Sequence, residues 1–325
     1  MIELINVTKI FPGAPSPSVD NVSFRVNQGN ICVLLGPSGC GKTTILRMMN
    51  RLEEPSSGKI LINSENTLKS DPSALRRSIG YVIQQTGLLP HRTVARNIAL
   101  VPGLLGWPQE KINSRVDELL KLMGLDSGDI ADKYPHQLSG GQMQRVGVAR
   151  AMAADPPIML MDEPFGAVDP IIRIRLQDEF LKLQQQVRKT ICFVTHDINE
   201  AIKMADYLII FNQGRLVQMG SPVEVLTSPA DDFVLSLIGD DRGVKILDLT
   251  RAETLMEPAD NISDDLLGSG CTVQSYQPVK LALEVMMKKN QDRVGVCRGN
   301  HLAGTLSWSD IKRHINKVSG EESEL

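Results

Sequence analysis

The feature that most constrains this chain is the glycine-rich stretch GPSGCGKTT at residues 36–44. It satisfies the pattern G-x-x-x-x-G-K-[ST] between the apolar run ICVLL and the helical run TTILRMMNRL, which is the strand–loop–helix context that this motif requires. Glycines let the backbone turn tightly so that successive N–H groups face an anion, and the helix N-terminus adds its dipole. We expect Lys42 to reach the β- and γ-phosphates of a nucleotide and Thr43 to bind Mg²⁺.

Short apolar runs alternate with helical patterns over most of the chain before residue 220. Four runs are almost wholly apolar, as strands covered on both faces should be: residues 31–35, 158–161, 190–195 and 207–211. Residues 171–187 have the apolar spacing of a helix, so the order strand–helix–strand predicts an α/β core with a parallel sheet. Residues 85–155 have helical patterns punctuated by prolines, and we expect them to form a helical subdomain inserted into this core.

The length of 325 residues predicts one large domain and a smaller one. We expect residues 1–239 to form the α/β domain and residues 240–270, which are acidic and rich in small residues, to be a linker. Residues 271–318 are predicted to form a small α+β unit, and residues 319–325 a tail. The expected elements of the unit at 271–318 are a strand at 272–275, a helix at 279–289, a hairpin at 293–306 and a helix at 309–314. A unit of about fifty residues gains from pairing with another copy.

The composition weighs against several kinds of partner and site. The net charge of −3 and the isoelectric point near 6.0 give no reason to expect nucleic acid. The five cysteines form no CxxC pair and lie in or near apolar runs, so we expect buried, reduced thiols and no zinc site. No run approaches the roughly 20 apolar residues that a membrane-spanning helix needs, so we expect a soluble chain.

Two carboxylates and a histidine follow predicted strands. Asp162 and Glu163 end the run IMLM, and because neighbouring strand residues point to opposite sides, Asp162 is expected on Mg²⁺ and Glu163 on the attacking water. His196 follows the run TICFVT, and the carboxyl ends of parallel strands meet at one edge, so His196 can reach the γ-phosphate region. Gln84 is expected to contact Mg²⁺ or water. A solvated turn, a surface histidine and a polar strand end are the alternatives.

A second glycine-rich turn, LSGGQMQR, occupies residues 138–145 before another helical run. A helix N-terminus with free N–H groups and a hydroxyl is a second anion-binding end. Ser139 is either a helix cap or a residue that closes over a nucleotide, and the residues alone leave both alternatives open.

The motifs GPSGCGKTT, Gln84, LSGGQ, MLMDEP, GAVD and His196 occur in the order seen in ATP-binding cassette (ABC) proteins, which residues 1–235 resemble. The resemblance implies a P-loop cassette that binds ATP and Mg²⁺ in a head-to-tail homodimer, where the LSGGQ turn of one subunit caps the ATP of the other. The residues implied to bind ATP are Phe11, which stacks on adenine, and Gly36, Pro37, Ser38, Gly39, Cys40, Gly41, Lys42, Thr43 and Thr44. Those implied to contact the partner's ATP are Ser139, Gly140, Gly141 and Gln142.

The resemblance assigns the remaining roles by matching position. Glu163, His196, Gln84 and Lys42 are the implied catalytic residues, and Thr43, Gln84 and Asp162 the implied Mg²⁺ ligands. Asp169, in GAVD, matches the loop that couples the two sites. GAVD replaces the commoner SALD, and Met143 stands where a polar residue is usual; neither departure removes a catalytic group.

The wording YVIQQTGLLPH, KYPHQLSGGQ and MDEPFGAVDP most resembles the ATPase subunits of bacterial importers for glycine betaine, choline and carnitine. This implies a peripheral protein on the cytoplasmic face of the membrane, with integral-membrane permease subunits and, indirectly, a substrate-binding protein as partners. Residues 271–316 resemble one cystathionine β-synthase (CBS) repeat, in which Ser307 and Asp310 match a nucleotide contact. A purely structural dimerisation element is the alternative for this unit.

Other functions are compatible with several of the same motifs. A cassette of another importer or of an exporter shares all the catalytic parts. A non-transport cassette more often shows tandem cassettes, a coiled-coil insertion or a basic surface, and a small-molecule P-loop kinase leaves LSGGQ without a role. Aromatic residues are only 4% of the chain, and quaternary amines are commonly held by aromatic cages, so we expect a separate protein to recognise the amine.

Overall fold

The computed structural model describes residues 1–83, 87–166, 168–258, 270–299 and 301–319, which divide into two compact units, Met1–Pro222 and Val223–Leu325. The division falls earlier than the expected domain end at residue 239. Gln84 lies outside the described residues. Within those residues, no helix has the length and apolar character needed to cross a membrane.

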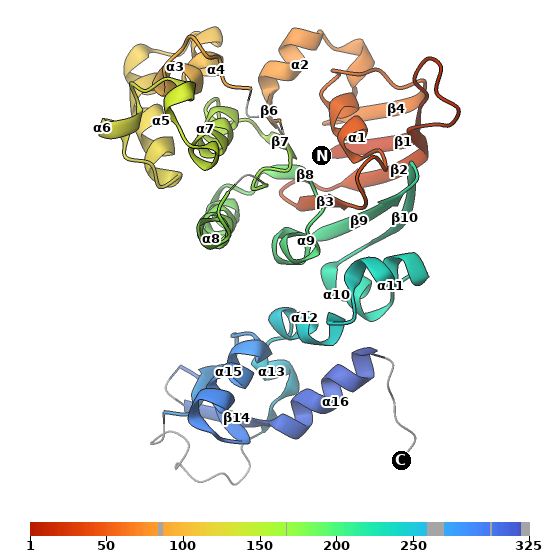
Figure 1. Ribbon diagram of the computed structural model, residues 1–325, viewed down its shortest axis with the longest axis vertical. Coiled ribbons are helices and arrows are strands. Elements are labelled where there is room, and N and C mark those ends of the chain that lie inside the picture. Colours follow the sequence, from red (N-terminus) through yellow and green to blue (C-terminus); the bar gives the residue numbers. More distant parts are fainter. Residues whose placement is uncertain (84–86, 167, 259–269, 300, 320–325) are drawn as a thin grey trace. The chain divides into compact units, whose positions relative to one another are not determined.

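The first unit is built around a six-stranded sheet in the order β10-β9-β3-β8-β7-β6 (Figure 1). Its strands are β3 (Ile31–Leu35), β6 (Ile79–Val82), β7 (Ile158–Asp162), β8 (Thr190–Thr195), β9 (Tyr207–Asn212) and β10 (Arg215–Gly220). Five strands are parallel, and β10 pairs antiparallel with β9. Every residue of β3, β7 and β8 is buried, because helices and a second sheet cover both faces. The predicted parallel α/β core is confirmed.

A second, antiparallel sheet has the order β2-β1-β4-β5. Its strands are β1 (Ile2–Lys9), β2 (Val19–Val26), β4 (Ser57–Ile62) and β5 (Glu65–Asn66). Helix α1 (Lys42–Met49), which begins inside the glycine-rich stretch, buries Ile45 and Met49 in a core shared with residues of both sheets. The helix that carries Lys42 is therefore held rigidly by its apolar face. A 3₁₀ turn, η1 (Thr67–Lys69), and helix α2 (Pro72–Ser78) follow before β6.

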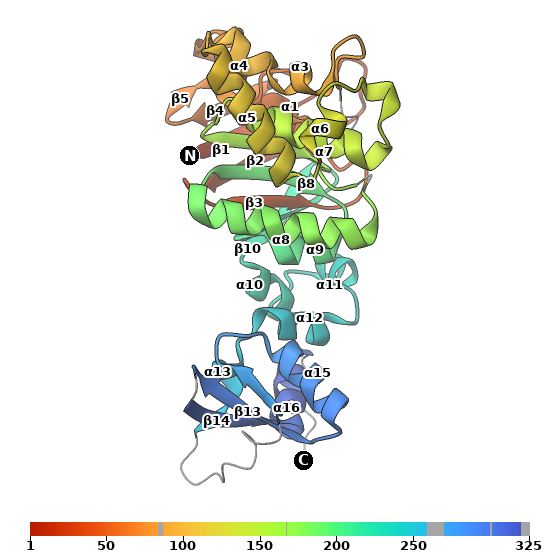
Figure 2. The same cartoon turned by 90° about the vertical axis from the view of Figure 1, so that its left-hand side faces the viewer.

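Residues 87–155, the described part of the expected helical insert, form helices and short turns. These are α3 (Val94–Ile98), α4 (Leu100–Leu104), α5 (Gln109–Leu122), α6 (Ser127–Ile130), η2 (Pro135–Gln137) and α7 (Gly140–Met152). They gather at one side of the first unit in Figure 1. Helices α8 (Pro170–Val187) and α9 (Ile198–Met204) connect strands of the core sheet, and α8 runs along the sheet in Figure 2.

The second unit contains the expected strand, helix, hairpin and closing helix. They are β12 (Thr272–Gln274), α15 (Val279–Lys289), the pair β13 (Arg293–Arg298) and β14 (His301–Ser307), and α16 (Trp308–Ser319). The sheet order is β11-β14-β13-β12, where β11 (Glu257–Pro258) pairs antiparallel with β14. Helices α10 (Pro222–Thr227) and α11 (Asp232–Ile238) lie at the start of the unit.

The expectation of a linker at residues 240–270 is wrong for its part up to residue 258. Helices α12 (Arg242–Leu249) and α13 (Ala252–Leu255) lie there and contact α15 or α16. Ile246, Leu247 and Ala252 are fully or almost fully buried, so the segment contributes to the core of the second unit. The linker was predicted because exposed acidic residues dominate the composition of this segment, which made its apolar face hard to recognise from the sequence. Residues 259–269 lie outside the described part of the chain.

Candidate active site

The phosphate-loop backbone is fixed by close contact with two other segments. A Cβ atom at Gly36 would lie 2.3 Å from the Phe211 carbonyl oxygen, and one at Gly41 would lie 2.3 Å from the Ser18 carbonyl oxygen. Their φ angles of 153° and 106° also favour glycine. The Gly214 N–H donates to the Cys40 carbonyl at 3.1 Å, which ties the loop to the turn between β9 and β10. The loop is therefore held in shape by backbone packing.

Lys42 lies at the start of α1, within the curve of this loop. Its side chain is buried, and its Nζ donates to the carbonyl oxygens of Gly36 and Pro37, each at 2.7 Å. Pro37, Ser38 and Gly39 are exposed on the other side of the loop. A positive charge and a helix N-terminus at a loop with an open outer side form an anion-binding site. Cys40 is buried, with its Sγ 3.5 Å from Lys42 Nζ.

Thr43 and Asp162 form an oxygen pair beside the loop. Thr43 Oγ1 donates to Asp162 Oδ1 at 3.1 Å. Burial raises the pKa of the Asp162 carboxyl, the Thr43 hydrogen bond lowers it, and the charge of Glu163 raises it further. A hydroxyl and a carboxylate are hard oxygen ligands of the kind that Mg²⁺ takes, and such sites are completed by phosphate oxygens and water. The pair fits Mg²⁺, whose charge would favour the ionised carboxylate.

Glu163 and His196 are brought together at the ends of β7 and β8. His196 Nδ1 lies 3.0 Å from Glu163 Oε1. Glu163 has a left-handed backbone, with a φ of 48°, which costs a non-glycine residue about 1–2 kcal/mol. Its N–H donates to the Val194 carbonyl at 3.0 Å. The strained turn and the histidine together orient a half-buried carboxylate next to Asp162, as a water-positioning base requires.

The second glycine-rich turn caps a helix. Ser139 is the N-cap of α7, where its Oγ accepts from the Gln142 N–H at 3.3 Å and Gln142 Oε1 accepts from the Ser139 N–H at 2.9 Å. Ser139 and Gly140 are exposed. The local role of Ser139 as a cap is thus present, and a contact from Ser139, Gly140, Gly141 or Gln142 to a partner's nucleotide stays a prediction. Asp169 likewise caps α8, accepting from the Ile171 N–H at 3.0 Å.

Phe11, which is expected to stack on adenine, is linked to the phosphate loop only through the segment that follows it. Phe11 follows β1 and lies against Lys9, whose Nζ is 4.8 Å from the ring centroid. The same segment ends at Ser18, whose Oγ lies 3.3 Å from Thr44 Oγ1. Stacking of Phe11 on adenine stays a prediction.

Ser307 and Asp310 belong to the second unit and form another helix cap. Asp310 Oδ2 accepts from the Ser307 N–H at 3.0 Å and from the Ser307 hydroxyl, at the start of α16. Asp310 is buried, and Arg313 lies 3.6 Å from it. Their polar atoms are engaged in the cap, and a nucleotide contact stays a prediction.

Sequence reasoning missed one residue of the site. Gln144 is only 2% exposed, and its Nε2 donates to the Glu163 carbonyl at 2.9 Å. The available signal was a polar residue close to the small and apolar residues of the helical run QMQRVGVARAMA, since a buried amide needs a specific partner.

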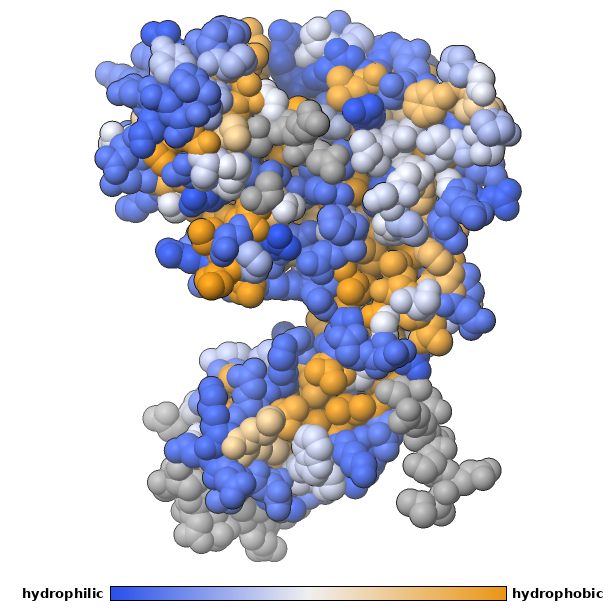
Figure 3. Space-filling view, viewed as in Figure 1, coloured by the Kyte–Doolittle hydropathy of each residue, from blue (hydrophilic) through white to orange (hydrophobic). Residues whose placement is uncertain are grey.

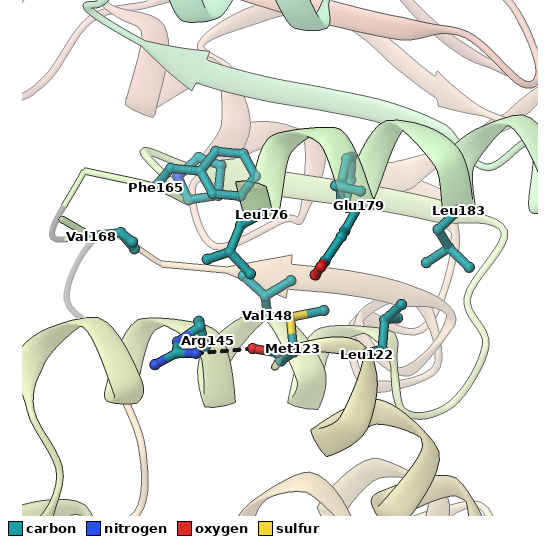
Figure 4. A pocket seen from close by; sticks show the side chains of 11 residues that line it. Leu122, Met123, Arg145, Val148, Phe165, Val168, Leu176, Glu179 and Leu183 are labelled. Carbon is teal, nitrogen blue, oxygen red and sulfur yellow. Dashed lines mark hydrogen bonds between the residues drawn. The ribbon is translucent and has the colours of Figure 1, made fainter. Parts of the chain in front are cut away.

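An apolar cavity of about 20 Å³ lies close to this region, between α5, α7 and α8 (Figure 4). Its lining includes Val148 of α7, Val168 and Leu176, with Arg145 and Glu179 also present. A cavity with this lining is suited to apolar groups and not to phosphate. This cavity is therefore not a candidate site for a phosphate-bearing ligand.

Comparisons with known proteins agree with this geometry. A family profile described as "ABC transporter" matches residues 19–166. The chain is 46% identical to the glycine betaine/carnitine/choline transport ATP-binding protein OpuCA of Bacillus subtilis, over 98% of this chain and 81% of the relative. It is 44% identical to the glycine betaine uptake system ATP-binding protein YehX of Escherichia coli, over 96% of this chain and 99% of the relative.

A solved structure shares the cassette fold. The dimeric ATP-binding cassette MJ0796, in a post-hydrolysis state bound to ADP and Pi, is 34% identical with a TM-score of 0.64. The match covers 68% of this chain and 99% of that one.

Proposed function

The chain belongs to the ATP-binding cassette transporter family, and on this premise we propose that it is the ATPase subunit of an importer for an osmoprotectant of the glycine betaine, choline or carnitine type. The observation that carries the catalytic part is the 3.0 Å contact between Glu163 and His196 beside the Thr43–Asp162 pair. The transport part rests on relatives that match nearly the whole chain and are named for uptake of these amines.

In this function the phosphate loop and Lys42 bind the phosphates of ATP. Bound Mg²⁺, held by Thr43 and Asp162, would neutralise charge on the phosphate oxygens. Glu163 orients or deprotonates the attacking water, and His196 holds the Glu163 carboxylate and stabilises charge that develops at the γ-phosphate. Lys42 stabilises the same charge.

We propose that two copies meet head to tail, so that Ser139 and Gly141 of one copy contact the ATP of the other. ATP binding then closes the dimer, and hydrolysis releases it. Closure acts on permease subunits, whose helices dock on the surface around residues 84–106, and the chain is proposed to lie at the cytoplasmic face of the membrane. Gln84, outside the described residues, is the proposed sensor of that partner.

Recognition of the amine belongs to other subunits in this proposal. The ring of Trp107 already lies 3.8 Å from the Nζ of Lys111, so its face holds a cation of the chain itself. Aromatic cages that bind quaternary ammonium groups need several such faces together. A substrate-binding protein and the permease would therefore select the solute.

The second unit is proposed to pair with its copy in the dimer and to regulate transport. Ser307→Ala in the full chain tests the nucleotide part of this proposal. A response of transport to adenine nucleotides or to osmotic strength that is unchanged by Ser307→Ala would restrict Ser307 to capping α16.

The experiment that tests the transport assignment is gentle extraction of the tagged chain from its native membrane, followed by identification of co-purifying proteins. We expect a polytopic permease, and after reconstitution with its binding protein an ATPase rate that responds to betaine or choline. Recovery of the chain only as a soluble dimer, or with ribosomes or DNA, would keep the ATPase and overturn the transport assignment.

A further inference from the structure

We propose that Gln144 is a positioning residue for ATP hydrolysis, which fixes the backbone of Glu163 relative to the helix α7 that begins at Ser139. The part of this inference that concerns two coupled sites rests on the head-to-tail dimer of the proposed function.

The contact is buried and specific. Gln144 is 2% exposed, and its Nε2 donates to the Glu163 carbonyl at 2.9 Å. A buried amide donor without a partner is costly, so the bond should persist while α7 keeps its place.

Glu163 depends on such contacts because its backbone is strained. Its N–H is held by the Val194 carbonyl of β8, and its carbonyl accepts from Gln144 of α7 and from the Gly166 N–H at 3.2 Å. The peptide groups on the two sides of the residue are thus fixed from different elements. The direction of the Glu163 carboxylate therefore depends on the position of α7 as well as on the sheet.

Helix α7 is suited to transmit a displacement. Gln144 lies about 7.5 Å along the helix axis from Ser139, at 1.5 Å per residue. Arg145 Nη1 donates to the Met123 carbonyl at 3.1 Å, and Arg150 Nη1 donates to the Gly87 carbonyl at 2.7 Å. Helix α7 therefore connects three parts of the chain. They are the turn at Ser139, which is proposed to meet the partner's nucleotide, Glu163 of the chain's own site, and Gly87.

The consequence is a coupling within one chain. When the partner's ATP orders or shifts the N-terminus of α7, Gln144 carries that shift to Glu163. Hydrolysis in one site then responds to occupancy of the other through the hydrogen bond from Gln144 to the Glu163 carbonyl.

The test uses Gln144→Met in the full-length chain, because methionine has a similar length and volume and lacks the donor. Gln184→Met is the matched control: Gln184 is also a buried glutamine, and its Nε2 donates to the Gly29 carbonyl at 2.9 Å and the Lys189 carbonyl at 2.6 Å, away from the phosphate loop. Steady-state kinetics with Mg·ATP and thermal unfolding are measured for both variants. The ATP-dependent dimer is measured by size exclusion in the Glu163→Gln background, with and without Gln144→Met.

We expect Gln144→Met to lower kcat by about 10- to 100-fold, since misplacing a catalytic group by an ångström has effects of this order. The KM for ATP should stay within about twofold and the Glu163→Gln dimer should still form, because the nucleotide contacts are intact. Ser139→Ala combined with Gln144→Met should be less impaired than the product of the single effects, as expected for residues that act in series.

The proposal is overturned if kcat is unchanged, if kcat falls only as much as in Gln184→Met, or if Gln144→Met abolishes the Glu163→Gln dimer. Additive effects of Ser139→Ala and Gln144→Met would overturn the coupling. If the Glu163→Gln chain forms no ATP-dependent dimer even with Gln144 present, the proposed dimer fails, while the kcat of Gln144→Met still decides whether Gln144 positions Glu163.

Discussion

The N-termini of α7 and α16 have nearly the same local chemistry. In both, a serine directly precedes the helix and a polar residue three positions later completes a reciprocal cap, Gln142 in α7 and Asp310 in α16. The helices differ in what lies beyond the cap, since Gln144 of α7 donates a hydrogen bond to Glu163, the proposed catalytic base. A capped helix N-terminus alone therefore does not identify a ligand site. The contacts made by the rest of the helix distinguish α7 from α16.

The largest effect on ATP hydrolysis should come from a change at Glu163, to which Gln144 of α7 donates a hydrogen bond. Glu163→Gln should reduce hydrolysis by about a thousandfold or more, because the water loses its base, while the loop still binds ATP. Phosphate release and size exclusion with ATP measure the two properties. Near-normal hydrolysis in this variant would remove Glu163 from its assigned role and, with it, the distinction between the two helices.

The next effect separates the two serines directly. Ser139→Ala and Ser307→Ala each remove a cap and should each cost about 1 kcal/mol of stability. Ser139→Ala should in addition lower kcat by about 10- to 100-fold through loss of a contact to the partner's ATP, whereas Ser307→Ala should leave hydrolysis unchanged. Denaturant unfolding and steady-state hydrolysis provide the measurements. If both variants kept the kcat of the unaltered chain, both serines would be only caps.

The two regions also differ in their buried aspartates, Asp162 at the end of β7 and Asp310 in the first turn of α16. Burial raises the pKa of Asp162, so the folded state binds a proton more tightly than the unfolded state, and the ionised carboxylate lowers stability at neutral pH. Asp162→Asn should abolish hydrolysis because it replaces a proposed Mg²⁺ ligand. Because it also removes a buried charge, it should raise the free energy of unfolding at pH 7. This gain should disappear as the pH falls below the ordinary pKa of an aspartate, where both states are protonated.

Asp310→Asn is the counterpart of this prediction, with the opposite sign. Asp310 accepts two hydrogen bonds at the N-terminus of α16, where a negative charge is favourable. Its replacement should lower stability at pH 7 by about 0.3–1 kcal/mol. Denaturant unfolding of both variants at pH 7 tests the pair, and Asp162→Asn is also measured at acidic pH. A loss of stability at pH 7 in Asp162→Asn would contradict the burial argument.

The smallest effect concerns the cavity beside α7. Val148→Ile adds one methylene group toward a space of about 20 Å³ and should stabilise the first unit by at most about 0.8 kcal/mol, with hydrolysis unchanged. Thermal unfolding measures the change. A lower melting temperature would show that the cavity walls do not accommodate the group.

The sequence predicted those parts of the fold whose residue pattern has only one physical explanation. Runs buried on both faces gave β3 and β8 with their observed bounds, and the phosphate loop required its glycines. The antiparallel sheet was not predicted. In β1 the alternation is broken by irregular pairing and by Asn6, whose φ is 48°.

The site was predictable where strand ends converge and uncertain where one residue type serves two roles. Asp162, Glu163 and His196 meet because parallel strands end at one edge. Ser139 stayed open between cap and ligand contact because the same hydroxyl does both. Gln144 was missed because a buried amide looks like any polar residue until its partner, a backbone carbonyl, is seen.

The close backbone contacts at Gly36 and Gly41 have a consequence for divergence. Both positions exclude a side chain because the carbonyls of Phe211 and Ser18 occupy the space, whether or not phosphate binds. A descendant of this chain that had lost its nucleotide would be free to change Lys42 and Glu163 but would still need these two glycines to fold. Among degenerate copies, the glycine pattern should therefore outlast the activity, and an intact Lys42 and Glu163 is the better mark of a working site.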